Sequence, residues 1–328
     1  MRVRLLLVIA IVVAEIVLAP AIVAQQTARV YRIGFLSPGV RSGGVFFPDA
    51  FRQAFRDAGY VEGRNLVIEE RFAEGYAGRV PTLAAELVEL KSDVIVTLGA
   101  SAAQAAKAAT STIPIVVMGA GDPVGTGLVA SMARPGGNIT GLTEFSTDLS
   151  GKRLQLLKEA VPGITKVAVL YNASDPAMTL RYKKLVDAAP IVGVAIQPLG
   201  VREPADFDTA FSTMTSNRPD AIVMVTDALT TLNRKQVIAF AKSNRIPLAA
   251  EFSNVVSDGA LMSYGWNPKD FYPRVVYFVD RILKGDKPGD LPIEGPTRFY
   301  LVINLNTAKT LRLTIPPSIL ARADEVIE

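Results

Sequence analysis

The sequence has no cysteine and no histidine among its 328 residues, and each absence excludes a class of protein. Without cysteine, the chain forms no disulfides and lacks the lipid-modified cysteine that tethers many bacterial surface proteins. Without histidine, it lacks the commonest general base, the commonest metal ligand and every nucleophile that depends on a Ser-His or Cys-His pair. Any hydrolytic chemistry would have to rest on carboxylates, lysine or tyrosine.

An excess of charge of one sign is also absent. The chain has 35 basic and 31 acidic residues and a net charge of +4. The basic residues are dispersed and interleaved with acidic ones, whereas a nucleic-acid-binding protein is expected to cluster them on one element. We therefore expect no nucleic-acid partner.

The start of the chain has the pattern of a secretory signal peptide. Two arginines precede an apolar run over residues 5–13, and small residues follow as far as Ala24. We expect residues 1–24 to be removed by cleavage after Ala24. Because Glu15 interrupts the apolar stretch, cleavage after Ala21 and an uncleaved anchor remain as alternatives. No other segment approaches the about 20 apolar residues of a membrane span, so we expect a soluble periplasmic product.

Strand-like and helix-like apolar patterns alternate from residue 30 onward. In the first half, strands are expected at residues 30–36, 66–72, 93–98 and 113–118, and helices at 47–58, 80–88 and 100–109. In the second half, strands are expected at 166–171, 194–199, 220–225 and 246–250, and helices at 176–189, 204–217 and up to 243. This alternation predicts two similar α/β lobes with parallel sheets.

Matching strands support an internal repeat. Residues 93–96 (DVIV) correspond to 220–223 (DAIV), and 113–116 (IPIV) correspond to 246–249 (IPLA). The alternative is that any two α/β strands share such patterns. A helix at 268–283, a strand at 299–304 and a short helix at 307–313 follow, so the chain is expected to cross between the lobes more than once.

Residues 122–143 (DPVGTGLVASMARPGGNITGLT) mark the place where the first α/β unit ends. Asp122 and Pro123 have the residue types of a helix N-cap and first helical position, so a capped helix is expected there. The glycines of residues 119–125 do not have the spacing of a dinucleotide-binding motif and are explained by a tight turn. Because ligands bind at the carboxyl ends of strands in open α/β sheets, loop 119–122 is expected to face a ligand.

A second candidate contact lies at residues 99–102, where a predicted strand meets a helix that begins with small residues. Backbone N–H groups and the hydroxyl of Ser101 would be open toward a cleft there. A helix N-terminus favours an anionic group such as a carboxylate. A plain N-cap without ligand contact is the alternative.

Polar residues occupy the corresponding strand ends of the second half. Asn172, Asp227 and Glu251 lie there, and one carboxylate could pair with a ligand amine. A plain helix cap at Asp227 and a solvated side chain at Glu251 are the alternatives. Tyr264 and Trp266 could each lay a ring against a ligand, although packing is the better interpretation for Trp266.

Several motifs in order, spread over residues 31–328, carry a family resemblance. They are residues 59–66 (GYVEGRNL), 122–143, 151–154 (GKRL), 156–159 (LLKE), 263–265 (SYG), 302–305 (VINL) and 322–328 (RADEVIE). Together they resemble the substrate-binding proteins of ABC transporters, in the family that includes tryptophan-binding and related aromatic amino-acid-binding members. The chain departs from the usual pattern at Ala173, where proline is common, and at Pro190, which interrupts a helix end.

The resemblance implies a type I periplasmic-binding-protein-like fold, in which three crossovers join two Rossmann-like lobes. The expected lobe limits are residues 28–143 plus 266–290, and residues 144–265 plus 291–328. The implied ligand contacts are Ser37, Ser101, Ala102 and Asp122 in the first lobe and Asn172, Asp227, Glu251 and Tyr264 in the second.

The same resemblance implies a function without catalytic residues, metal or cofactor. A monomer would bind a small organic ligand, such as an amino acid or a related compound, and deliver it to an ABC permease at the inner membrane. A periplasmic ligand sensor for a membrane signalling protein is the alternative with the same fold.

Overall fold

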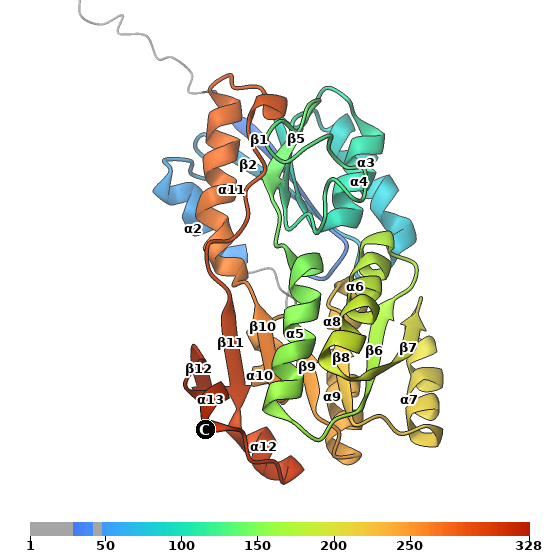
Figure 1. Ribbon diagram of the computed structural model, residues 1–328. Helices are drawn as coiled ribbons and strands as arrows, with labels where there is room; N and C mark the ends of the chain where they lie inside the picture. Colours follow the sequence, from blue (N-terminus) through green and yellow to red (C-terminus); the bar gives the residue numbers. More distant parts are fainter. Residues whose placement is uncertain (1–28, 42–47) are drawn as a thin grey trace, which may run out of the picture.

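The computed structural model describes residues 29–41 and 48–328, so the predicted signal peptide lies outside the described residues. Two α/β lobes lie one above the other (Figure 1). The strands are β1 (Tyr31–Ser37), β2 (Leu66–Phe72), β3 (Val94–Leu98), β4 (Ile115–Met118), β5 (Ile139–Leu142), β6 (Lys166–Asn172), β7 (Ala195–Val201), β8 (Ala221–Met224), β9 (Leu248–Ala250), β10 (Met262–Gly265), β11 (Tyr300–Asn304) and β12 (Glu325–Ile327).

The helices alternate with these strands along most of the chain. They are α2 (Pro48–Asp57), α3 (Val80–Glu89), α4 (Ala100–Ala109), α5 (Ser146–Ala160), α6 (Pro176–Val192), α7 (Asp206–Ser216), α8 (Ala228–Leu232), α9 (Arg234–Ser243), α10 (Ser253–Ser257), α11 (Pro268–Leu283), α12 (Leu305–Leu311) and α13 (Pro317–Leu320), with 3-10 turns η1 (Ala77–Arg79) and η2 (Pro288–Asp290). Within the described part of the chain, no helix is long and apolar enough to cross a membrane.

The first lobe is a parallel five-stranded sheet in the order β2-β1-β3-β4-β5. Its strands are buried on both faces. Val94 and Val96 of β3 pack with α2 and α11, whereas Ile95 packs with α3 and α4 on the opposite face. Strands covered by helices on both sides need apolar residues at nearly every position, which explains the continuous apolar runs of the sequence.

The second lobe is a seven-stranded sheet in the order β12-β11-β10-β9-β8-β6-β7. Helices α5 and α6 cover the face to which Val167 points, and α7 and α9 cover the face of Ala168. The strands from β7 to β10 are parallel, but β11 runs antiparallel to β10, with Met262 opposite Ile303. The carboxyl ends of the parallel strands face the first lobe, so a strand that enters from that lobe must run in the opposite direction.

The chain passes between the lobes three times, after β5, after β10 and before β11, as the resemblance implied. The second passage places α11 in the first lobe, where this late helix lies beside the early helix α2 (Figure 1). The alternating pattern and the two-lobe fold are confirmed. The residue limits of the two lobes stay a prediction.

Both sheets reverse their strand order at one point. In the first lobe the reversal lies between β1 and β3, and in the second between β6 and β8. The connections that leave two such neighbouring strands run to opposite faces of the sheet, and a crevice opens between them. The topology therefore provides one ligand-binding crevice in each lobe.

Three expectations about helices were wrong. The helix expected at Asp122 and Pro123 is a series of turns, because Gly127 at φ +68° ends the helical path after one turn. Helix α6 continues through Pro190, and Gly193 at φ +74° ends it. The single helix expected before residue 243 is divided into α8 and α9 at Asn233, whose backbone leaves the helical region.

Gly141 is required where β5 lies against β4. Its φ is +131°, and a Cβ there would lie 2.2 Å from the Val117 carbonyl oxygen. We expect Gly141→Ala to lower the free energy of unfolding by about 3 kcal/mol, because a paired strand backbone cannot move aside. Urea denaturation followed by circular dichroism measures this change. Gly163→Ala, whose Cβ would meet nothing within 4 Å, is the control, and equal losses in the two variants would contradict the prediction.

Candidate functional site

A cavity of about 630 Å³ lies between the two lobes. Its lining includes residues at the reversal point of each sheet. Ser37 ends β1 and Ser101 follows β3, while Asn172 ends β6 and Asp227 follows β8. The two crevices that the topology provides are therefore combined in one cavity.

The first-lobe wall presents the start of α4. Gly99 is the N-cap of this helix at φ +83° and offers no side-chain acceptor, and Ala100 and Ser101 line the cavity. The first N–H groups of a helix have no partner within the helix, and the helix dipole adds partial positive charge there. This wall can hold an anionic group of a ligand.

The second-lobe wall presents the carboxylate of Asp227. One oxygen accepts a hydrogen bond from Asn172 Nδ2 at 2.6 Å, and the other accepts from the Thr230 backbone N–H at 2.9 Å, which caps α8. Burial raises the pKa of Asp227 above its usual value, although the hydrogen bonds from Thr230 and Asn172 act in the opposite direction. A ligand cation would relieve the cost of keeping this carboxylate charged.

Aromatic side chains form an apolar part of the lining. Trp266 is 5% exposed, and its ring stacks on Phe271 with centroids 4.0 Å apart. Phe252, which also lines the cavity, meets Trp266 edge to face at 5.4 Å. Such contacts hold the indole ring in one orientation next to the cavity. Packing was the expected role of Trp266, and the ring packs while it also lines the cavity.

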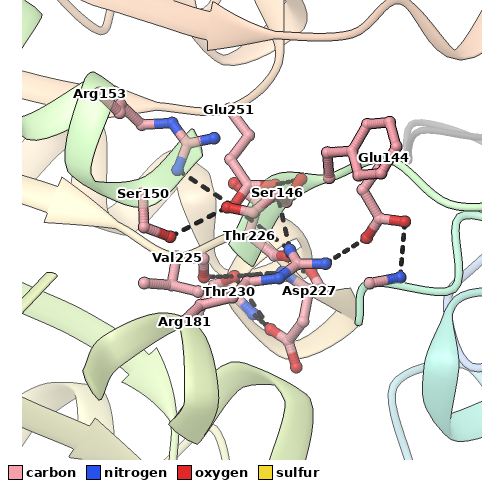
Figure 2. A network of polar contacts seen from close by, with 12 residues as sticks. Glu144, Ser146, Ser150, Arg153, Arg181, Val225, Thr226, Asp227, Thr230 and Glu251 are labelled. Atoms are coloured by element: carbon pink, nitrogen blue, oxygen red, sulfur yellow. Dashed lines mark hydrogen bonds and ion pairs between the residues drawn. The ribbon is translucent and has the colours of Figure 1, made fainter. Parts of the chain in front are cut away.

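Four buried charges lie next to the cavity, where the chain first crosses between the lobes (Figure 2). Arg181 of α6 contacts Glu144 of the crossover and lies 3.1 Å from a Glu251 carboxylate oxygen. Arg153 of α5 lies 3.5 Å from the other oxygen of Glu251. Glu144 also accepts a hydrogen bond at 2.8 Å from the Gly121 backbone N–H of the first lobe. The network therefore connects the first-lobe loop, the crossover and the second lobe.

The two arginines of this network respond differently to burial. Burial lowers the pKa of Arg153, and the nearby Glu251 offsets this only in part. Burial also acts to lower the pKa of Arg181, but Glu251 and Glu144 together outweigh it and leave that pKa raised. Arg181 is thus the better compensated cation, as its position between two carboxylates requires.

The lobes also approach closely on the side of the cavity where Gly75 and Leu232 lie. A Cβ on Gly75 would lie 2.3 Å from Leu232 Cδ1, and the φ of Gly75 is +84°. Both residues line the cavity. Glycine at this position lets the first-lobe loop lie directly against α8.

Of the predicted first-lobe contacts, Ser37 and Ser101 line the cavity, and Ala102 and Asp122 are not among the lining residues. The side chain of Ala102 packs in the core, although its backbone N–H belongs to the exposed first turn of α4. Asp122 follows β4, one strand beyond the reversal point, and its carboxylate accepts a hydrogen bond from Gly125 N at 2.8 Å.

Of the predicted second-lobe contacts, Asn172 and Asp227 line the cavity, and Glu251 and Tyr264 are not among the lining residues. Glu251 is 1% exposed and belongs to the ion network. Tyr264 packs in the core, and its carbonyl oxygen accepts a hydrogen bond from Arg153 Nε at 3.0 Å. All eight residues stay predictions as ligand contacts.

The sequence reasoning missed the cavity residues Glu144 and Arg181. A signal for Arg181 was present in the apolar stripe of α6, where Ala177, Leu185 and Ala189 recur at helical spacing with Arg181 among them. A charged residue on a buried helical stripe needs a buried partner. Glu144 had no such pattern, because it lies in a crossover.

Glu251 is the residue on which the ion network depends. We expect Glu251→Gln to lower the free energy of unfolding by about 3 kcal/mol, because it leaves two buried arginines with one carboxylate. Urea denaturation measures the loss. Glu159→Gln, which removes the exposed partner of Arg322 on α5, should cost less than about 1 kcal/mol. Similar costs for the two variants would show that the network does not stabilise the fold.

Comparison with known proteins places this geometry in a family. A model of the ABC transporter substrate binding protein family matches residues 47–327. A tyrosine-binding protein of Clostridioides difficile (strain R20291) is 30% identical over 262 residues, which cover 80% of this chain and 75% of that protein.

Solved structures show the same fold. A conserved domain protein of Vibrio cholerae is 28% identical, with a TM-score of 0.85 over 91% of this chain and all of that chain. An L-Trp complex from Streptococcus pneumonia is 26% identical, with a TM-score of 0.81 over 90% of this chain and all of that chain. A ligand-free, open substrate-binding protein from Clostridium difficile is also 26% identical, but its TM-score is 0.64 over 91% of this chain and 99% of that chain. The expected type I periplasmic-binding-protein-like fold is confirmed, and the chain belongs to the family of ABC transporter substrate-binding proteins.

Proposed function

We propose that this protein is an exported receptor that binds an aromatic α-amino acid between its lobes and passes it to an ABC permease at the inner membrane. The observation that carries the proposal is the opposite polarity of the two cavity walls. The start of α4 faces the cavity from one lobe, and the Asp227 carboxylate faces it from the other. A zwitterion with its two charges about one carbon apart suits such a pair of walls.

The polarity of the two walls assigns a partner to each charge of the ligand. The ligand carboxylate binds Ser37, Ser101 and the first N–H groups of α4, while the ligand ammonium group binds Asp227. Asn172 donates to Asp227 and keeps the carboxylate oriented toward the cavity. Because the two ligand charges contact different lobes, ligand binding stabilises the closed arrangement over the open one.

An aromatic side chain is supported by the lining and by the relatives. Phe252 and Trp266 offer ring surfaces, and Met118 and Met178 add apolar area. Two relatives carry ligands of this class in their names, one a tyrosine-binding protein and one an L-Trp complex. The L-Trp complex and the ligand-free, open protein are both 26% identical to this chain, but the TM-score is higher for the L-Trp complex. This difference supports a closed arrangement of the lobes, like that of a ligand-bound relative.

Export and delivery complete the proposal. The predicted signal peptide of residues 1–24 supports a periplasmic location, and the family supports an ABC permease as the partner. A receptor with micromolar affinity needs a binding free energy of about −8.2 kcal/mol, which includes the cost of lobe closure.

Replacement of Asp227 tests the proposed ammonium contact. We expect the wild-type protein to bind at least one of L-tyrosine, L-tryptophan and L-phenylalanine, and Asp227→Asn to bind it at least about 50-fold more weakly, because a buried ion pair is lost. Isothermal titration calorimetry measures both affinities. Asp208→Asn, on the exposed side of α7, should leave the affinity unchanged. If no aromatic amino acid binds, or if the two variants bind alike, the proposed function is wrong.

The raised pKa of Asp227 predicts a pH dependence. The ammonium group of the ligand stays mostly protonated below about pH 7.5, because the pKa of an α-amino group lies at about 7.7 or higher. The change of charge at lower pH therefore comes from the Asp227 carboxylate. Affinity should be full above the pKa of Asp227 and should fall as the pH falls through it, starting at a higher pH than for an ordinary aspartate. Titrations at pH values from about 7.5 to about 4 measure this. An affinity that stays constant down to the ordinary aspartate pKa of about 3.9 would contradict the assignment.

A further inference from the structure

Acidic residues outnumber basic residues in the lining of the cavity. The charged residues of the lining are Glu144, Asp175, Arg181 and Asp227. Arg181 is the basic member of this set, and it already pairs with Glu144 and Glu251. Together with Arg153, the partner of Glu251, the buried network holds as many positive as negative charges. The network therefore leaves no positive charge for a ligand.

Asp175 and Asp227 remain without an ion-pair partner within residues 29–41 and 48–328. Asp175 accepts a hydrogen bond from Ala177 N at 2.8 Å and caps α6. Burial raises the pKa of Asp227, and the negative charge of Asp175 raises it further. Asp175 also interacts electrostatically with Arg181, so Asp227 is the carboxylate of the second-lobe wall that a ligand cation would stabilise.

A ligand carboxylate has weaker support in the same cavity. It meets the start of α4 and the hydroxyl groups of Ser37 and Ser101, and no unpaired lysine or arginine is among the lining residues. A partly buried helix N-terminus strengthens the binding of an anion by at most about 30-fold. Close charge pairs at an interface have coupling energies of about 1.5–7 kcal/mol, so an ion pair with the buried Asp227 carboxylate can contribute more than this.

We propose that the ammonium group is the essential part of the ligand and the carboxylate is dispensable, so that the cavity also binds aromatic primary amines, which are monocations. This proposal rests on the proposed function, because it places the amine in the same cavity. It extends the ligand class beyond amino acids, and it excludes aromatic carboxylic acids that have no amino group.

Three ligands that share one ring separate the contributions of the two charges. L-Tyrosine has both charges, tyramine lacks the carboxylate, and 3-(4-hydroxyphenyl)propionate lacks the ammonium group. Isothermal titration calorimetry at about pH 7.5 should give tyramine a Kd within about 30-fold of that of L-tyrosine. The propionate should bind more than about tenfold more weakly than tyramine. A larger loss for tyramine, or a smaller one for the propionate, would overturn the proposal.

Matched variants assign the effect to the ammonium site. Asp227→Asn should weaken tyramine binding at least about 50-fold, whereas Asp175→Asn, which also keeps a capping side chain, should weaken it less than about fivefold. Equal losses at Asp175 and Asp227 would overturn the proposal.

The same titrations distinguish a failure of the amine proposal from a failure of the proposed function. If L-tyrosine binds and tyramine does not, the amine proposal fails and the proposed function stands. If none of the aromatic amino acids binds, the proposed function itself fails.

Discussion

The buried pairing of two arginines with two glutamates is the interaction on which the arrangement of the lobes depends. Arg181 joins Glu144 of the crossover to Glu251 at the end of β9, and Arg153 completes the set. Charges taken out of water are tolerated only when partners surround them, so these residues hold one another in place. Glu144 also binds the Gly121 backbone, so the network positions the first-lobe loop relative to the second lobe.

The neutrality of this network determines which charges the neighbouring cavity can offer to a ligand. Because Arg181 is committed to two carboxylates, it does not offer its charge to a ligand. The remaining polarity comes from the uncapped start of α4 on one wall and from Asp227 on the other. Hydrogen bonds from Asn172 and Thr230 keep the Asp227 carboxylate in place without neutralising it. The cavity can therefore recognise a positive group more strongly than a negative one.

Much of the fold could be predicted from the sequence because it depends on local patterns. Apolar runs of strand length alternate with helical stripes, and both faces of each sheet are covered, so the pattern of a parallel α/β protein is visible directly. The helix expected at Asp122 failed for a local reason as well, since Gly127 leaves the helical region. The direction of β11 could not be predicted from the sequence, because it depends on the lobe from which the chain enters the second sheet.

The residues of the candidate site could likewise be predicted only in part. Ser37, Ser101, Asn172 and Asp227 follow strands at the two reversal points and line the cavity, whereas Asp122 and Glu251 follow strands beyond those points and do not. A strand end is recognisable in the sequence, but the order of strands in a sheet is not.

The sequence by itself determined the fold class, the family and the polar groups available at strand ends, because these depend on composition, periodicity and motifs. Only the tertiary structure decided which of those groups share a cavity and which charges neutralise one another. Arg181 and Glu251 are 70 residues apart, and their contact exists only once α6 has packed beside the end of β9 within the second lobe. Pairing between distant residues depends on the packing of whole elements, which no local pattern contains.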